Sequence, residues 1–203
     1  MEARLRRLER DLLPAKRPTG NYSQHECDRI RAYSLLVHAE IEYWLESAVI
    51  KIADGVLTKW RDDRKPRTCL AALIAFRDDE ETGAWKRVTG LPESIASPKG
   101  PSAELLDRIE YMKDRFCQRV KLKNHGIREK NILGLLLPVG VRPRDIDPAW
   151  LGTIDGFGSR RGVTAHTASR AQQPPDRDDE LRDVNTILSG LRQLLPTLRS
   201  LMV

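Results

Sequence analysis

Apolar residues recur every three or four positions along most of this chain, which is the spacing of helices that bury one face. The longest uninterrupted run covers about residues 23–60 and contains no proline. Its apolar positions are Ile30, Tyr33, Val37, Ile41, Trp44, Ala48 and Ile52. A helix of that length would extend roughly 57 Å, so we expect it to bend or break near Gly55.

The same periodicity predicts several further helices, which glycines and prolines separate. They are expected over residues 1–13, 66–76, 102–123, 127–137, 148–154 and 178–202, with one more helix beginning at 164–166 after a glycine cluster. Residues 78–101, 138–147 and 170–176 are expected to be loops or linkers. No alternating β-pattern of useful length is present. The sequence therefore predicts an all-α antiparallel helical bundle over 22–170, preceded by a helix and linker (1–21) and followed by a linker and C-terminal helix (171–203).

Composition bounds the compartment in which we expect the chain to work. The start, MEARLRRLERDLL, is charged throughout, unlike a secretory signal, and the longest apolar run is the proline-containing ILGLLLPVGV. A membrane span needs roughly 20 apolar residues. Cys27, Cys69 and Cys117 are widely spaced and form no CxxC pair, which is typical of reduced thiols. We therefore expect a soluble cytoplasmic protein with no membrane partner.

Charge adds a modest preference for polyanionic partners. The 203 residues include 35 Lys and Arg against 29 Asp and Glu, a net charge of +6. Such an excess favours RNA or DNA through long-range attraction. Acidic and basic residues alternate along the whole chain, however, and a solvated helical surface explains most of the charge equally well.

The residue types that suit phosphodiester chemistry gather in GSRRGVTAH, residues 158–166. Arg161 and His166 are separated by four residues, and Arg160 stands one position further away. A guanidinium binds a phosphate bidentately and stabilises growing charge, while an imidazole can remove or supply a proton near neutral pH. The spacing alone is not specific, because Arg31 with His38 and Arg119 with His125 also lie close together in sequence.

Other polar residues have both a structural and a functional interpretation. His38 and Glu42 lie four apart on one helix face, where they could orient catalytic groups or, as packing favours, join two helices. Asn124 stands at a predicted turn, where capping is the simpler interpretation. The acidic clusters at 77–80 and 177–180 could hold Mg²⁺ but read more simply as helix caps. Neither the histidines nor the cysteines have zinc-ligand spacing, so we expect no metal and no cofactor.

Three segments resemble the RiboL-PSP group of HEPN domains. They are RAYSLLVHAEIEYWLESAV (31–49), NHGIREKNILGLLLPVG (124–140) and DPAWLGTIDGFGSRRGVTAHTAS (147–169), in the order usual for that group. The resemblance covers roughly residues 22–170 and implies a helical bundle that commonly dimerises. It also implies a catalytic arginine followed after four to six residues by a histidine, here Arg161 and His166. The family usually has a polar residue after that arginine. Gly162 follows Arg161, whereas Arg161 itself follows Arg160, so the choice between the two arginines stays open.

Helix geometry limits how this pair could act. Positions five apart in a regular helix point about 140° away from each other. The glycines at 156, 158 and 162 predict that Arg161 lies in a turn or first helical turn, from which its long side chain could reach His166. A two-fold dimer offers a second solution, because it would place two Arg/His pairs around one cleft.

The resemblance implies a metal-independent endoribonuclease in which the RNA 2′-hydroxyl attacks, leaving a cyclic phosphate and a 5′-hydroxyl. Many such proteins are toxins or act in defence against phage, so an antitoxin or other regulatory partner is expected beside RNA and a second copy of the chain. The leading alternative is a catalytically silent HEPN module that binds RNA or a protein as a scaffold. A DNA-binding helical regulator is a third reading, for which the sequence offers no helix-turn-helix.

Overall fold

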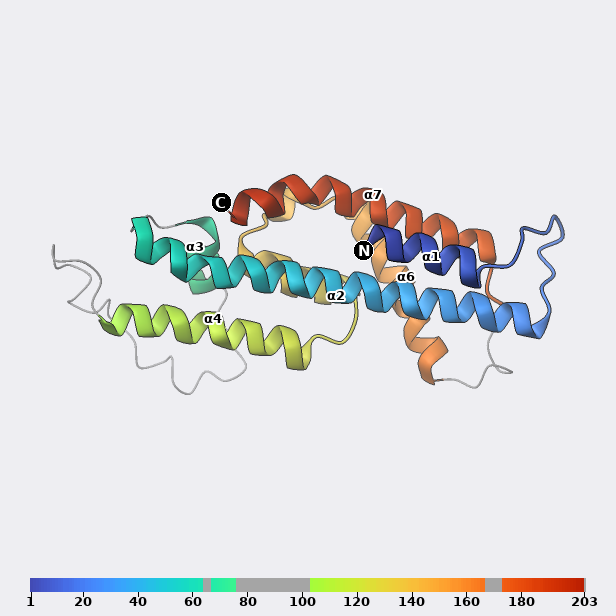
Figure 1. Cartoon of the computed structure of the whole chain (residues 1–203), viewed down its shortest axis with the longest axis horizontal. Helices are drawn as coiled ribbons and strands as arrows, with labels where there is room; N and C mark the ends of the chain where they lie inside the picture. The colour runs from blue at the N-terminus through green and yellow to red at the C-terminus, as the bar shows by residue number, and fades with distance from the viewer. Residues whose placement is uncertain (64–66, 76–102, 167–172, 203) are drawn as a thin grey trace.

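A computed structural model describes residues 1–63, 67–75, 103–166 and 173–202 (Figure 1). These residues form helices and turns, with no β-strand among them. The prediction of an all-α fold is therefore confirmed. The predicted loop at 78–101 and the acidic cluster at 77–80 lie outside the described residues.

The helices follow the apolar periodicity closely. The α-helices are α1 (Glu2–Leu12), α2 (Gln24–Asp63), α3 (Thr68–Ala75), α4 (Ala103–Lys123), α5 (Glu129–Leu136), α6 (Pro148–His166) and α7 (Arg177–Met202). Two short 3-10 turns, η4 (Leu137–Val139) and η5 (Pro143–Asp145), lie between α5 and α6, where the prolines predicted a loop. Most predicted helices thus begin and end within a few residues of the observed bounds.

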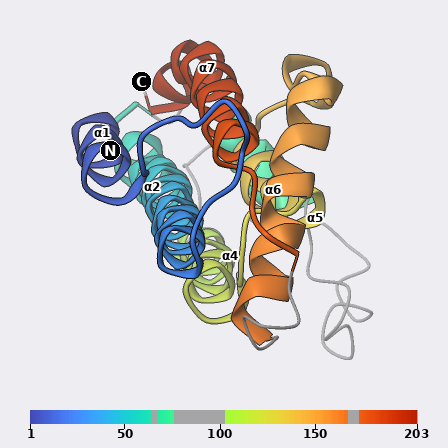
Figure 2. The ribbon, with the colours of Figure 1, turned by 90° about the vertical axis from the view of Figure 1, so that its right-hand side faces the viewer.

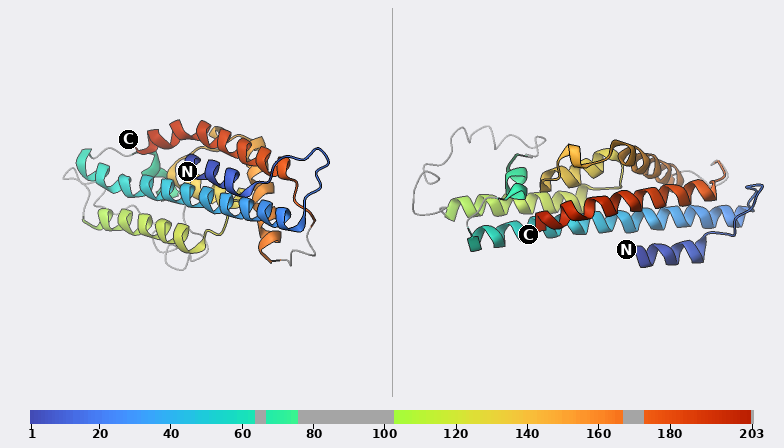
Figure 3. Two further views of the ribbon diagram at one scale, coloured as in Figure 1. Left: turned by 45° about the vertical axis from the view of Figure 1, so that its right-hand side comes forward. Right: turned by 90° about the horizontal axis from the view of Figure 1, so that it is seen from above.

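The long helix α2 is the centre of the molecule, and α1, α4, α6 and α7 surround it (Figures 1 and 2). Helices α1 and α4 run antiparallel to α2, and α6 runs antiparallel to α7. Helices α2 and α7 lie side by side and run in the same direction (Figure 3). Ser34 bonds to Glu180 near the start of both helices, and Lys59 contacts the carbonyl of Met202 near their ends. The segment from α3 to α6 provides the return path that this parallel pair needs.

The core follows a single stripe along α2. Its members, each at most 1% exposed, are Ile30, Tyr33, Val37, Ile41, Leu45, Val49 and Ile52. Leu45 and Val49 take the places that the sequence pattern assigned to Trp44 and Ala48, which are only half-buried. Burying one large apolar side chain contributes about 1.5–3 kcal/mol, so this stripe is a major source of the stability of the bundle.

The sequence predicted that the long helix would bend or break near Gly55. A break there was wrong, because α2 continues to Asp63. Ala53, Val56 and Leu57 are buried on either side of the glycine. A glycine inside a helix costs only about 1 kcal/mol relative to alanine. The burial of its neighbours is worth more than that, and the helix therefore persists.

The expected break at the glycine cluster of residues 156–162 was also wrong. A single helix, α6, runs from Pro148 to His166 and includes Gly156, Gly158 and Gly162. At Gly158 a β-carbon would lie 3.2 Å from the backbone nitrogen of Arg128, so the missing side chain permits a close approach of α6 to the start of α5. Here the glycine serves helix packing rather than a turn.

A second close approach joins α6 to α7. The indole nitrogen of Trp150 donates a buried hydrogen bond of 3.0 Å to the carbonyl of Ile187. The same ring covers Gly190, where a β-carbon would lie 2.0 Å from its Cδ1 atom. The α6–α7 pair therefore depends on the absence of a side chain at position 190.

Gly190→Ala is expected to lower the free energy of unfolding by about 1–3 kcal/mol, because the indole must move away from its hydrogen bond. Gly152→Ala is the matched control, since nothing lies within 4 Å of a β-carbon there. That control should be neutral or stabilise by about 0.4–1 kcal/mol. Urea denaturation of the two variants measures both values. Equal stability of the variants would contradict the close contact.

Candidate active site

His38 lies in the interior, on the face of α2 that meets α6. Its side chain is 1% exposed, and its ring stacks on Phe157 of α6 with a centroid distance of 6.4 Å. Its Nδ1 atom is buried and has no hydrogen-bond partner among the residues that the structure describes. The nearest carboxylate oxygen, Oε2 of Glu42, is 3.6 Å away, which is too long for a hydrogen bond. The His38 ring is therefore tightly packed, while its Nδ1 atom makes no hydrogen bond to the described residues.

One helical turn further, Glu42 holds the turn that follows α4. Its Oε1 accepts the backbone N–H of Gly126, whose φ of +130° favours glycine. The Asn124 amide donates to Glu42 at 3.5 Å and to Glu46 at 2.7 Å, and accepts from the Asn131 amide at 3.1 Å. The structure thus brings His38, Glu42 and Asn124 together, as a polar network that joins α2, α4 and α5.

Arg161 of α6 acts on this network through its charge. Burial and, to a smaller extent, the positive charge of Arg161 together lower the pKa of His38 to about 4. Burial raises the pKa of Glu42, while the Gly126 N–H and the Arg161 guanidinium oppose that rise. His38 is therefore neutral at pH 7, and the guanidinium of Arg161 lies close enough to both side chains to affect their protonation.

Arg161 also borders a cavity of about 570 Å³ between α2, α6 and α7. The side chain is half-buried, and it forms no hydrogen bond or ion pair with any residue that the structure describes. A guanidinium in this position is available to an anion that enters the cavity.

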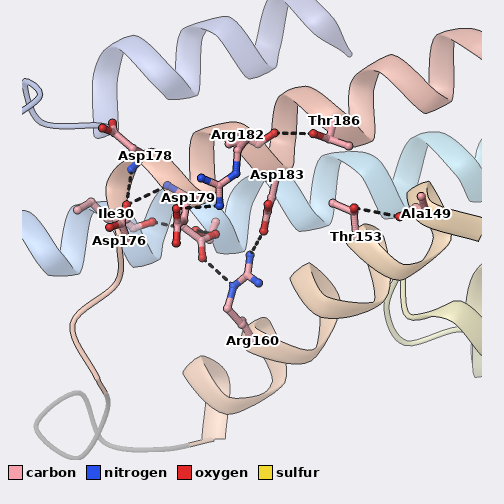
Figure 4. Close-up of polar contacts among 12 residues, drawn as sticks. Ile30, Ala149, Thr153, Arg160, Asp176, Asp178, Asp179, Arg182, Asp183 and Thr186 are labelled. Carbon is pink, nitrogen blue, oxygen red and sulfur yellow. Dashed lines mark hydrogen bonds and ion pairs between the residues drawn. The ribbon is translucent and has the colours of Figure 1, made fainter.

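Arg160 differs sharply from its neighbour. It donates to Glu180 of α7 at 2.9 Å and to Asp183 at 2.5 Å, and it lies over the ring of Phe157 at 5.8 Å (Figure 4). The Glu180 side chain is only 9% exposed, and its second oxygen accepts the Ser34 hydroxyl at 2.7 Å. Arg160 therefore joins α6 to α7 and, through Glu180, to α2.

His166 is the last residue of α6, and its side chain lies outside the described part of the structure. The expectation that Arg161 occupies a turn was wrong, because Arg161 and His166 belong to one helix. Their positions are separated by about 140° around the helix axis.

The two other arginine–histidine pairs lack the features of a site. Arg31 bonds to Asp28 at 2.9 Å and to the carbonyl of Gln173, two turns away from His38. Arg119 donates to the carbonyl of Gly134 and lies over a phenylalanine ring, while His125 is exposed on the turn after α4. Both arginines therefore have structural partners.

The acidic cluster at 177–180 forms the first turn of α7. Asp176 caps this helix by accepting the N–H groups of Asp178 and Asp179 at 2.8 and 2.9 Å (Figure 4). Asp178 pairs with Lys16, and Glu180 pairs with Arg160. The helix-start interpretation accounts for these carboxylates. Within the described ranges, no three His, Cys, Asp or Glu side chains gather in a way that could hold a metal ion.

Sequence reasoning missed the residues that complete these networks. Glu46 continues the four-residue spacing of His38 and Glu42 on α2, so that spacing could have revealed it. Asn131 carries no comparable signal. Glu180 and Asp183 are 20 and 23 residues from Arg160, and only the packing of α7 on α6 brings them together.

The low pKa of His38 predicts a specific acid sensitivity. Between pH 6.5 and about 4 the unfolded chain binds a proton at this residue and the folded chain does not, so stability falls as the pH drops. His38→Gln should therefore reduce the loss of unfolding free energy between pH 7 and pH 4 by about 3 kcal/mol. Glu42 is present in both proteins, so its opposite effect largely cancels in the comparison.

Urea denaturation at a series of pH values measures this difference. His25→Gln is the matched control, because His25 is exposed and its loss should leave the wild-type pH dependence unchanged. Parallel losses of stability in His38→Gln and wild type would show that His38 is not held in its neutral form.

Comparisons with known proteins add no relative, since the chain matches no protein-family model, no curated protein and no solved structure. In the residues that the structure describes, no helix is both long and apolar enough to cross a membrane.

Proposed function

We propose that this protein is a metal-independent endoribonuclease of the HEPN type. The observation that carries the proposal is the contrast between the adjacent arginines of α6. Arg160 is held by Glu180 and Asp183, whereas Arg161 borders a cavity without a carboxylate partner among the described residues. Cleavage by general acid–base catalysis needs a group that binds the phosphate and a histidine that moves protons. Arg161 is suited to the first role, and the same helix carries His166.

In this proposal Arg161 binds the scissile phosphate, and His166 moves the proton. The 2′-hydroxyl of the RNA attacks the adjacent phosphorus, and the bond to the 5′-oxygen of the next nucleotide breaks. That oxygen receives a proton, which leaves a 2′,3′-cyclic phosphate and a 5′-hydroxyl. His38, Glu42 and Asn124 are positioning residues, because their network fixes the surface of α2 against which the Arg161 segment of α6 packs.

We propose that this chemistry uses a second copy of the chain. Positions 161 and 166 are about 140° apart around a regular helix, which supports a site in which the histidine of each protomer serves the arginine of its partner. Light scattering at micromolar concentration should report twice the mass of one chain. A strict monomer that still cleaves RNA would contradict the shared site.

The same geometry also favours the alternative of a catalytically silent HEPN module that binds RNA or a protein. If α6 stays regular in a monomer, the arginine remains a phosphate ligand without a proton donor. A nuclease assay in EDTA separates the two proposals. The enzyme cleaves RNA in the chelator, whereas the scaffold binds RNA and leaves it intact at every metal concentration.

For the biological role, we propose a cytoplasmic toxin or phage-defence effector that a partner protein, such as an antitoxin, holds in check. Expression of the wild-type chain without that partner should halt growth, and His166→Ala should relieve the arrest. Growth arrest that persists in the His166→Ala strain would show that the toxicity does not depend on the proposed chemistry.

A further inference from the structure

The cavity beside Arg161 has the size and the mixed walls of a ligand site. Its volume of about 570 Å³ lies inside the range of roughly 300–1,000 Å³ that is typical of small-molecule pockets. Helices α2, α6 and α7 form its walls, and residues 173–176, which precede α7, close one side. The polar contacts along its α7 wall are visible in Figure 4.

Most of the guanidinium groups around the cavity are paired with carboxylates. Four guanidinium groups line it, and three of them pair with carboxylates. The three pairs are Arg31–Asp28, Arg160–Glu180 and Arg182–Asp179. Arg161 is the fourth, and no carboxylate of the described residues pairs with it. A nucleotide phosphate would therefore be drawn to the Arg161 side of the cavity.

The remaining lining suits a flat ring with hydrogen-bond donors on its edge. Leu35, Phe157, Pro174 and Pro175 supply apolar surface. The carboxylates of Asp176, Asp179, Glu180 and Asp183 supply acceptors on the wall formed by α7 and the residues before it. Asp179 is more than half exposed, and only its Oδ1 atom is paired, with Arg182 at 2.8 Å. Its other oxygen lone pairs can accept further N–H donors.

We infer that this cavity is a nucleobase subsite that prefers guanine, with Asp179 as the residue that reads the base. The inference rests on the proposed function, since it places the phosphate of the same nucleotide at Arg161. Guanine offers two parallel N–H donors, N1–H and the N2 amino group, which match the two oxygens of one carboxylate. Uracil turns carbonyl oxygens toward the same wall and is repelled by the carboxylates there.

The test is calorimetric binding of nucleoside monophosphates to the full chain. Guanosine 3′- and 5′-monophosphates are compared with the two uridine counterparts. One well-placed bidentate pair gives about tenfold or greater discrimination, so the better guanosine nucleotide should bind at least about tenfold more tightly than either uridine nucleotide. Asp179→Asn should remove that preference, because it weakens guanosine binding and relieves the repulsion of uracil.

Asp178→Asn is the matched control, because it removes the same charge from the same helical turn. Asp178 pairs with Lys16 and does not line the cavity. It should therefore leave the guanosine preference intact. Equal preference in Asp178→Asn and Asp179→Asn, or no preference in wild type, overturns the subsite.

A second pair of variants tests the cavity itself. Leu35→Trp should fill it and weaken guanosine monophosphate binding by about tenfold or more, while Leu36→Trp, at an exposed position that does not line it, should not. Guanosine binding without RNA cleavage would uphold the subsite and reject the nuclease. Cleavage in EDTA with no effect of Asp179→Asn would do the reverse.

Discussion

His166→Ala is expected to lower the rate of RNA cleavage by about 10²–10⁴-fold, which is the usual contribution of general acid–base catalysis. RNA affinity should change far less, because the proposed role of this histidine is proton transfer, whereas Arg161 binds the phosphate. Single-turnover cleavage and equilibrium RNA binding, measured on the same preparation, separate the two effects.

His125→Ala is the control for this experiment, because His125 is an exposed histidine on the turn after α4. It should cleave RNA at the wild-type rate. Full activity in His166→Ala would remove His166 from the mechanism. His38 would then be the histidine to examine, although its burial and its pKa near 4 suit a positioning role better than proton transfer.

Arg161→Ala is expected to weaken RNA binding and to lower cleavage by about 10²–10³-fold, because one preorganised donor to the transition state is lost. Arg161→Lys should recover part of the affinity but little of the rate, since an ammonium cannot bind a phosphate bidentately. Binding and single-turnover assays on both variants give the two effects separately.

Arg160→Ala is the neighbouring comparison, and it should act mainly on stability. It removes the guanidinium partner of the nearly buried Glu180, which then keeps only the Ser34 hydroxyl bond, at a cost of about 1–3 kcal/mol. Once folded, this variant should cleave RNA far better than Arg161→Ala. If folded Arg160→Ala is inactive and Arg161→Ala is active, the phosphate-binding role belongs to Arg160 and not to Arg161.

Much of this architecture was predictable from apolar spacing alone. Helix α2 is 40 residues long, contains no proline and has regularly spaced apolar positions. Helices α4 and α7 were predicted within a few residues of their observed bounds. The two errors, at Gly55 and at the glycines of α6, have one cause. Glycine weakens a helix by about 1 kcal/mol, and only the tertiary structure shows whether neighbouring burial exceeds that cost.

The candidate site was predictable only in its local parts. The spacing of His38 and Glu42 placed them on one face, and the structure adds their contact with the turn at Asn124. The pairing of Arg160 with carboxylates could not be predicted from sequence, because it depends on Glu180 and Asp183 of another helix. Such long-range pairs carry no periodic signal in a single chain.

The chemistry of the RNA ends tests the central claim most directly. Wild-type protein and Arg161→Ala are incubated with RNA in excess EDTA, and the product ends are identified by mass spectrometry. We predict 2′,3′-cyclic phosphate and 5′-hydroxyl ends from wild type, with strongly reduced product from the variant. Cleavage that requires added Mg²⁺ and leaves 3′-hydroxyl and 5′-phosphate ends would contradict attack by the 2′-hydroxyl and the role assigned to Arg161.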